Sequence, residues 1–315
     1  MSFCNPCISI IIPTKNRPHL IEKSIKSILN QTYQDFEIII VDSSQTDDTK
    51  KILEALILNQ KRIKYFQFRE KEGIPAARNF GVIKSVGEYI AFQDDDDEWL
   101  PDKLAKQIMV FKRLESDACV GVVYTGLCVH EKGQKFYIPN QFIRIKEGDI
   151  LKELLKENFV STQTMLINKK CFDEIGMFNE NLPSFEDWEF VIRLSKKFKF
   201  KIVDEPLVNA FIQTDSNSRN EENNHKSLEI IIQEHYLDFY KEKKLLSKHY
   251  SNLGHYYCSK GDIERGRGFF IKEFKIYPSI LAILTLFSTF LGKEYFNQLK
   301  CCVKSSSKIM SFVKL

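Results

Sequence analysis

The sequence is poor in the residues that define fibrous, linker-like and disulfide-stapled proteins. Its 315 residues include only 13 Gly and 9 Pro, which excludes a collagen-like repeat. The 8 cysteines are too sparse for a disulfide framework in a chain of this length. Cys4 and Cys7 form a lone C-x-x-C without a second pair at zinc-finger spacing. We therefore expect no disulfide scaffold, no structural zinc, and a reducing cytoplasmic compartment.

Long apolar runs and a large net charge are also missing. The longest apolar stretch, 280–291, is shorter than the roughly 20 residues that a helix needs to span a bilayer. No basic region followed by an apolar run opens the sequence, so we expect no secretory signal. The 46 basic and 42 acidic residues leave a net charge of +4, too small to predict a nucleic-acid partner. With 43% hydrophobic residues, the chain can still bury a normal core.

The first two thirds of the chain alternate strand and helix patterns. Short β-branched runs separated by ten-residue helical patterns predict right-handed βαβ crossovers and a mainly parallel sheet. We expect strands at 7–12, 36–41, 63–66, 89–92, 120–124, 163–167 and 199–203, and helices at 20–29, 49–58 and 187–197. Such sheets bind ligands at the carboxyl ends of their strands, where Pro13, Asp42 and Asp94 fall.

A polar stretch without periodicity, 214–224, predicts a domain boundary. We place a catalytic domain at 1–215 and an all-helical appendage at 216–315. An apolar stripe that begins at Leu228 and ends at Phe239 predicts the first helix of this appendage.

The appendage contains a pattern that resembles a single tetratricopeptide-type repeat, at about 248–279. Gly266 departs from it, because the pattern prefers Ala there. One repeat cannot bury its own faces, so the helix pair must pack on the catalytic domain, a partner chain or a membrane. The tail, 280–315, is apolar and then basic, which suits either a membrane-surface segment or a buried terminal helix pair.

An acidic run, Asp94-Asp95-Asp96-Asp97-Glu98, directly follows the expected strand at 89–92. Five consecutive carboxylates repel one another and raise each other's pKa unless a cation is present. Oxygen-rich sites suit hard divalent ions such as Mg²⁺ or Mn²⁺. A solvated acidic turn is the alternative, but the position at a strand end favours a site.

Five segments, in order along the chain, carry a family resemblance. They are Ile-Ile-Ile-Pro-Thr-Lys-Asn-Arg at 10–17, Ile-Val-Asp-Ser-Ser-Gln-Thr-Asp at 40–47, Gly-Ile-Pro-Ala-Ala-Arg-Asn-Phe-Gly at 73–81, Asp94-Asp95-Asp96, and Phe185-Glu186-Asp187-Trp188. Through them the chain from Ile8 to about Val208 resembles the family 2 glycosyltransferases, inverting enzymes with the nucleotide-sugar-binding fold called GT-A. Any one segment is a weak signal, whereas the ordered set is a specific one.

The resemblance implies roles for the candidate residues. Those implied to bind a nucleotide sugar, with a UDP-sugar favoured, are Pro13, Thr14, Asn16, Arg17, Asp42, Arg78, Asp94 and Asp95. Asp42 would accept a hydrogen bond from the nucleobase, or merely cap the following helix. Arg78 would pair with the diphosphate, or form a surface salt bridge. Asp96 is the implied ligand of a divalent metal ion (Mg²⁺ or Mn²⁺), which would neutralise the leaving nucleoside diphosphate.

An inverting transfer also needs a base that takes the proton of the acceptor hydroxyl. The resemblance points to Asp187, with Glu186 as the second choice. Ser184-x-x-Asp187 equally resembles a capping box in which Asp187 only stabilises the start of a helix.

The sequence thus predicts an α/β GT-A domain, a mainly parallel sheet flanked by helices, with an all-helical C-terminal appendage. Its expected function is metal-dependent inverting sugar transfer to a glycan or lipid-linked acceptor in surface glycan, polysaccharide or glycolipid assembly. We expect a cytoplasmic protein, with membrane-surface or homo-oligomer contact through the C-terminal helices left open. The alternatives are a nucleotidyltransferase, which would not need Glu186 and Asp187, and a nucleotide-binding interaction protein with a degenerate catalytic domain.

Overall fold

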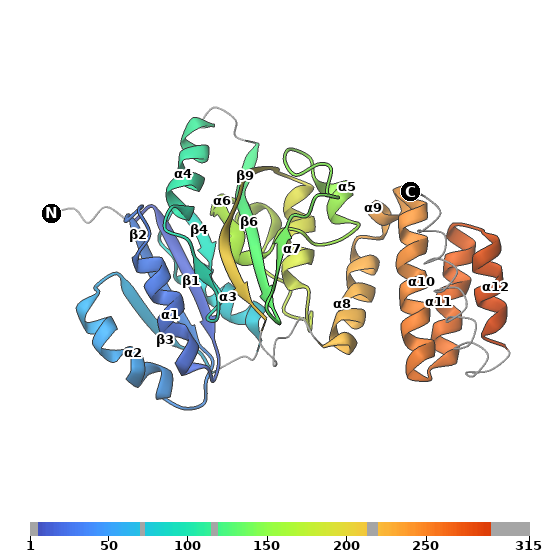
Figure 1. Ribbon diagram of the computed structural model, residues 1–315, viewed down its shortest axis with the longest axis horizontal. Helices are drawn as coiled ribbons and strands as arrows, with labels where there is room; N and C mark the ends of the chain where they lie inside the picture. The colour runs from blue at the N-terminus through green and yellow to red at the C-terminus, as the bar shows by residue number, and fades with distance from the viewer. Residues whose placement is uncertain (1–5, 70–72, 115–118, 213–219, 291–315) are drawn as a thin grey trace. The chain divides into compact units, whose positions relative to one another are not determined.

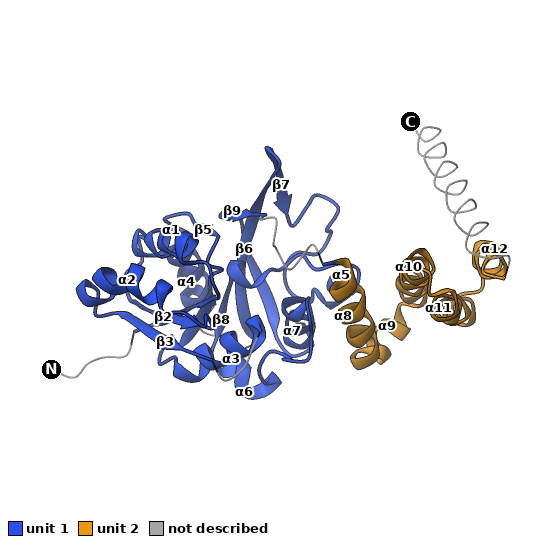
Figure 2. Cartoon of the chain, turned by 90° about the horizontal axis from the view of Figure 1, so that it is seen from below, with its two compact units in different colours: residues 1–220 blue, residues 221–315 orange. Residues whose placement is uncertain are grey.

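The computed structural model describes residues 6–69, 73–114, 119–212 and 220–290 (Figure 1). The chain divides into two compact units, Met1–Asn220 and Glu221–Leu315 (Figure 2). Our predicted division was at 215/216. Most of the polar stretch that suggested it lies outside the described residues, and from Glu221 onward that stretch is helical rather than a loop.

The first unit is built on one sheet, in which the described strands follow the order β3-β2-β1-β4-β8-β6-β9-β5, with β7 paired to β6. The strands are β1 Ile8–Thr14, β2 Phe36–Asp42, β3 Ile63–Gln67, β4 Tyr89–Phe92, β5 Glu98–Trp99, β6 Val120–Glu131, β7 Gln134–Ile138, β8 Met165–Asn168 and β9 Lys199–Phe211. β3, β2, β1 and β4 are parallel, β8 runs antiparallel to β4 and β6, and β6 is parallel to β9. The predicted α/β class is confirmed.

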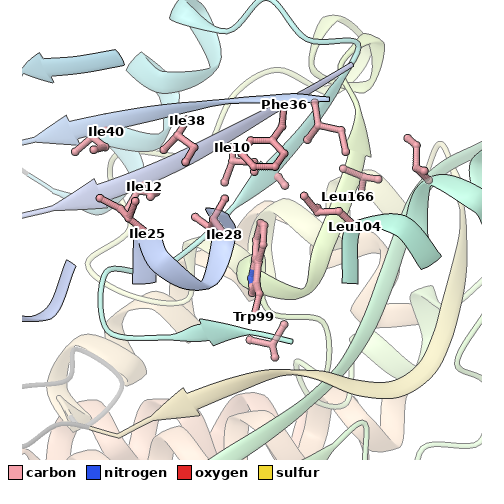
Figure 3. Close-up of a cluster of buried hydrophobic side chains, with 14 of the residues drawn as sticks. Ile10, Ile12, Ile25, Ile28, Phe36, Ile38, Ile40, Trp99, Leu104 and Leu166 are labelled. Carbon is pink, nitrogen blue, oxygen red and sulfur yellow. The ribbon is translucent and has the colours of Figure 1, made fainter. Parts of the chain in front are cut away.

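Helices cover both faces of this sheet. They are α1 Pro18–Leu29, α2 Asp48–Asn59, α3 Ile74–Lys84, α4 Lys103–Arg113, α5 Leu151–Leu154, the 3₁₀ turn η1 Thr162–Thr164, α6 Lys170–Ile175 and α7 Glu186–Ser195. Alternate residues of a strand point to opposite faces. Ile10 and Ile12 of β1 therefore join Ile25 and Ile28 of α1 in one buried cluster (Figure 3). On the opposite face, Ile11 meets α3.

The packing of α3 on β1 explains a helix that hydrophobic periodicity did not predict. Its sequence has small residues where an amphipathic helix would carry large apolar ones. A Cβ built on Gly81 would lie 2.4 Å from Ile11 Cγ2, so only glycine permits this approach. The final glycine of the 73–81 segment thus allows α3 to pack closely against Ile11 of β1.

The second unit is helical over its described residues. Its helices are α8 Glu221–Glu234, α9 Tyr236–Lys241, α10 Lys243–Lys260, α11 Ile263–Ile276 and α12 Ile280–Ser288. The predicted first helix is divided into α8 and α9 at His235. α10 and α11 form the expected helix pair, and Gly261 (φ +98°) ends α10. The part of the predicted tail from 291 onward lies outside the described residues.

The departure at Gly266 has a steric cause. A Cβ there would lie 2.3 Å from Cys258 Sγ and 2.8 Å from the carbonyl oxygen of Gly254, so α10 and α11 approach too closely for Ala. Across the described residues, the helices are all too short or too polar to cross a bilayer.

Candidate active site

The acidic run lies where β4 ends, and backbone contacts fix it there. The Gln93 amide donates to the Ile11 carbonyl of β1 at 3.0 Å, which extends the sheet by one residue. The Ser24 hydroxyl of α1 donates to the Asp94 carbonyl at 3.0 Å. The Asp97 amide donates to the same carbonyl at 3.3 Å. The acidic residues therefore form a defined turn at the carboxyl end of the parallel strands, in which Asp95 and Asp97 are buried.

Both carboxylate oxygens of Asp97 accept hydrogen bonds from other residues of the protein. Asp97 is 4% exposed, and its two oxygens accept from Gln163 Nε2 at 2.9 Å and from the Phe211 amide at 3.1 Å. Burial, together with the charges of Asp94 and Asp96, raises its pKa well above the usual range. Asp97 therefore ties the turn to η1 and to the end of β9.

The carboxylates of Asp95 and Asp96 both contact the guanidinium of Arg17. Thr14 Oγ1 donates to Asp95 Oδ2 at 2.7 Å. Arg17 Nη1 lies 3.5 Å from Asp95 Oδ1 and 3.2 Å from Asp96 Oδ2. The predicted donor residues Thr14 and Arg17 are thus brought to the acidic turn.

Asp96 lies among carboxylates whose mutual repulsion a bound divalent cation would reduce. Burial, and then the charges of Asp94 and Asp95, raise the pKa of Asp96 to about 7. One of its oxygens contacts Arg17, and the neighbouring Asp95 and Thr14 carry further oxygen atoms. A hard ion of the Mg²⁺ or Mn²⁺ class fits such a donor set.

Arg78 lies between the acidic turn and helix α7. It is 3% exposed, and its guanidinium donates to Asp94 Oδ1 at 2.8 Å and to Glu186 Oε1 at 2.6 Å. The charges of Asp94 and Glu186 raise the pKa of Arg78 against the effect of burial. The predicted alternative, a surface salt bridge, is wrong because the guanidinium is buried. A contact of Arg78 with diphosphate stays a prediction.

Asp187 lies in the first turn of α7, directly after the residue that Arg78 holds. Phe185 precedes the helix in a left-handed conformation (φ +58°), and it does not cap the helix through its side chain. Asn158 Nδ2 donates to Asp187 Oδ2 at 3.0 Å. Burial and the charge of Glu186 raise the pKa of Asp187 to about 7, while Arg78 acts in the opposite direction. The predicted capping box at Ser184 is wrong, because the helix starts after Phe185.

The nucleoside candidates form a second group at the ends of β1 and β2. Asp42 is 0% exposed and accepts from the Ser44 amide at 2.8 Å and from the Tyr65 hydroxyl at 2.6 Å. The Asn16 amide donates to Ser44 Oγ at 2.7 Å, so the loop after Pro13 lies against the loop after β2. Asp42 does not cap α2, which begins after Asp47. Its contact with a nucleobase stays a prediction.

Several supporting residues carry no signal that sequence reasoning could use. Asn158, Gln163 and Tyr65 each hold one of the acidic side chains, but they stand alone in polar or apolar segments. Asn79 does have a signal, its place beside Arg78 in the Ala-Ala-Arg-Asn segment. Asn79 Nδ2 donates to the Phe178 carbonyl at 3.0 Å and to Glu180 Oε1 at 2.9 Å, which anchors the loop before α7.

Comparisons with known proteins concern the family of the chain and its fold. The sequence profile "Glycosyl transferase family 2" matches residues 9–176. A glycosyltransferase of Haemophilus influenzae is 43% identical over 66% of the chain and 79% of its own length. The GalNAc(5)-diNAcBac-PP-undecaprenol beta-1,3-glucosyltransferase of Campylobacter jejuni is 35% identical over 56% of the chain.

Coverage of the relatives is partial. The chain spans 53% of the Campylobacter jejuni enzyme and 26–37% of three Rickettsia glycosyltransferases. Among solved structures, Staphylococcus aureus TarS 1–349 in complex with UDP-GlcNAc has a TM-score of 0.72 at 17% identity. The structural match covers 95% of this chain and 92% of the TarS chain. At that identity the likeness concerns the fold.

Proposed function

The chain belongs to glycosyl transferase family 2, and from that membership we propose that it transfers a sugar from a nucleoside-diphosphate sugar to a hydroxyl acceptor with inversion. One observation carries the proposal. Arg78 joins Asp94, at the end of β4, to Glu186, the residue before the proposed base Asp187. Arg78 therefore holds one donor-side carboxylate and the residue next to the proposed base in one hydrogen-bonded group.

Asp187 is the proposed general base. A pKa near 7 is close to the optimum for a base that works at neutral pH, since about half of the groups are then deprotonated and each accepts a proton readily. Asn158 orients the carboxylate through one oxygen. The acceptor hydroxyl would attack the sugar carbon as its proton passes to Asp187, and the bond from that carbon to the diphosphate would break. Glu186, whose carboxylate is held by Arg78, is less suited to this role.

Asp96 is the proposed ligand of a divalent metal ion, Mg²⁺ or Mn²⁺. When bound, such an ion supplies positive charge to the departing diphosphate. This proposal is supported by the crowding of Asp94, Asp95 and Asp96, which raises the pKa of Asp96. Arg17, which contacts Asp95 and Asp96, brings a protein cation to the same place.

The donor and acceptor classes are proposals as well. A UDP-sugar is supported by the fold shared with TarS, which was crystallised with UDP-GlcNAc. A lipid-linked glycan acceptor is supported by the printed activity of the Campylobacter jejuni relative. We also propose that the C-terminal helices contact a membrane surface or a second copy. This is supported by α12, whose side chains Ile280, Leu281, Leu284 and Phe287 are exposed.

A thermal-shift screen of nucleoside diphosphates, each with and without Mn²⁺, tests the proposal. We expect one nucleotide to raise the melting temperature, and Mn²⁺ to increase that shift. Uridine diphosphate is the nucleotide we expect. An absence of stabilisation by every nucleotide, with and without the metal ion, would contradict the proposed function.

A further inference from the structure

A second surface of the first unit, the hairpin segment 132–146, exposes large apolar side chains. It contains the turn after β6, strand β7 and the loop that follows, and β7 stands out from the rest of the unit in Figure 2. The side chains of Phe136, Tyr137 and Phe142 are 47%, 57% and 78% exposed, and Ile145 is 45% exposed. Phe136 and Tyr137 are consecutive in β7, so this strand exposes an aromatic side chain on each of its two faces. Exposed apolar side chains that lie close together mark a contact surface, whereas isolated ones need no explanation.

The hairpin segment holds these side chains outward by defined contacts. β6 and β7 pair directly from Glu131↔Gln134 to Leu127↔Ile138. The two residues between them have positive φ (49° and 79°), as the tight hairpin turns do. Asn140 Oδ1 accepts from the Phe142 amide at 2.8 Å, and the neighbouring Ile143 is buried. Phe142 is therefore presented by a fixed turn whose next residue anchors it.

The charge of the hairpin segment has one sign. Between Lys132 and Lys146 the sequence has four basic residues and no acidic one. Lys146 pairs with Asp204 at 3.2 Å. Within the described part of the chain, Lys132, Lys135 and Arg144 are exposed and have no carboxylate partner. Three unpaired cations thus lie in the same segment as the exposed apolar side chains.

We propose that the hairpin segment binds the surface of an anionic lipid bilayer. Aromatic and aliphatic side chains enter the boundary between headgroups and acyl chains, and lysine and arginine attract anionic headgroups. A second copy of the chain fits less well, because two segments of the same charge repel. Nucleic acid fits less well too, since it would leave Ile145 against polar groups.

The hairpin segment is continuous with the candidate active site. Leu127 to His130 of β6 pair with Val208 to Phe211 of β9, and the Phe211 amide donates to Asp97. A bilayer on the hairpin would therefore be connected to the acidic turn through β6 and β9. That this brings a lipid-linked acceptor near the turn rests on the proposed function, whereas the lipid contact itself does not.

The test is co-sedimentation of the full chain with vesicles of phosphatidylcholine, alone or with about one part in four of phosphatidylglycerol. We expect binding to the anionic vesicles that falls with salt. Lys135→Gln/Arg144→Gln should weaken partitioning by about fivefold for each cation removed. Phe142→Ser should weaken it by about tenfold or more. α12 is unchanged in these variants, so differences report the hairpin.

Matched controls lie in the same unit, on and after α2. Leu58 is 76% exposed, and Lys50 and Lys61 are exposed cations. Leu58→Ser and Lys50→Gln/Lys61→Gln should partition as the unaltered chain does. Equal partitioning of the hairpin variants and the controls would overturn the proposal, as would equal binding to neutral vesicles. Hairpin-dependent dimerisation, or oligonucleotide binding, without vesicle binding would also overturn it. Nucleotide shifts in the same variants report the proposed function separately.

Discussion

Arg78 of α3 donates to Glu186 Oε1 of α7 at 2.6 Å, across 108 positions of the sequence. The other arm of the same guanidinium reaches Asp94 at 2.8 Å. A planar fork can hold two carboxylates at a fixed separation, which a lysine ammonium does less well. Arg78 thereby sets the position of the start of α7, and so of Asp187, against the acidic turn.

Replacing the guanidinium of Arg78 should lower the stability of the protein. We expect Arg78→Lys to lower the free energy of unfolding by on the order of 1–3 kcal/mol, because one partly buried carboxylate loses its partner. The control is Arg69→Lys, whose pair with Asp47 at 3.1 Å is exposed and should contribute little to the stability. Urea unfolding of both variants measures the difference. Equal stabilities would show that the bridge through Arg78 is unimportant.

Asp96 and Asp97 are neighbours with opposite expected behaviour. Asp96→Asn should abolish the extra thermal stabilisation that Mn²⁺ gives to the nucleotide complex. Asp97→Asn should lower the stability by about 1–3 kcal/mol, because its new amide faces the donors of Gln163 and Phe211, yet keep the Mn²⁺ effect. Calorimetry with and without Mn²⁺ separates the two. A retained metal effect in Asp96→Asn would contradict the assigned ligand.

The pH dependence of transfer should report Asp187. A base must be deprotonated, so kcat/KM should rise as pH increases through about 7, the raised pKa of Asp187. Asn158 donates to the carboxylate and favours its charged form. Asn158→Ala should therefore raise the pKa of Asp187 and move the acidic limb of the kcat/KM profile to higher pH. An unchanged limb in this variant would argue that another group titrates.

The helix pair of the second unit offers two glycines for comparison. Gly266→Ala should destabilise the protein by about 1–3 kcal/mol, because its Cβ would meet Cys258 and the backbone of α10. Gly268 lies in the same helix with no atom near its Cβ position, so Gly268→Ala should stabilise by up to about 1 kcal/mol. Thermal unfolding compares them. A neutral or stabilising Gly266→Ala would contradict the close approach of α10 and α11.

The buried apolar runs of the sequence predicted most strands of the sheet, whereas the amphipathic helix α4 was missed. β1, β2 and β4 are β-branched or aromatic runs that end at polar residues, and those ends place the acidic turn and Asp42 on one edge of the sheet. The sequence did not predict α3, because a helix that packs through alanine and glycine has no apolar stripe. It also could not predict the partners of the site residues. Asn158 and Gln163 meet Asp187 and Asp97 only through the tertiary fold.

The measurement that tests the account most directly uses Asp187→Asn, which keeps the shape of the side chain and removes its capacity as a base. Transfer and nucleotide binding would be measured on the same preparation, with product formation from a UDP-sugar and with the thermal shift produced by UDP and Mn²⁺. We predict a loss of transfer by at least about a hundredfold, with the nucleotide shift unchanged. Near-normal transfer by Asp187→Asn would contradict the assignment of Asp187 as the base.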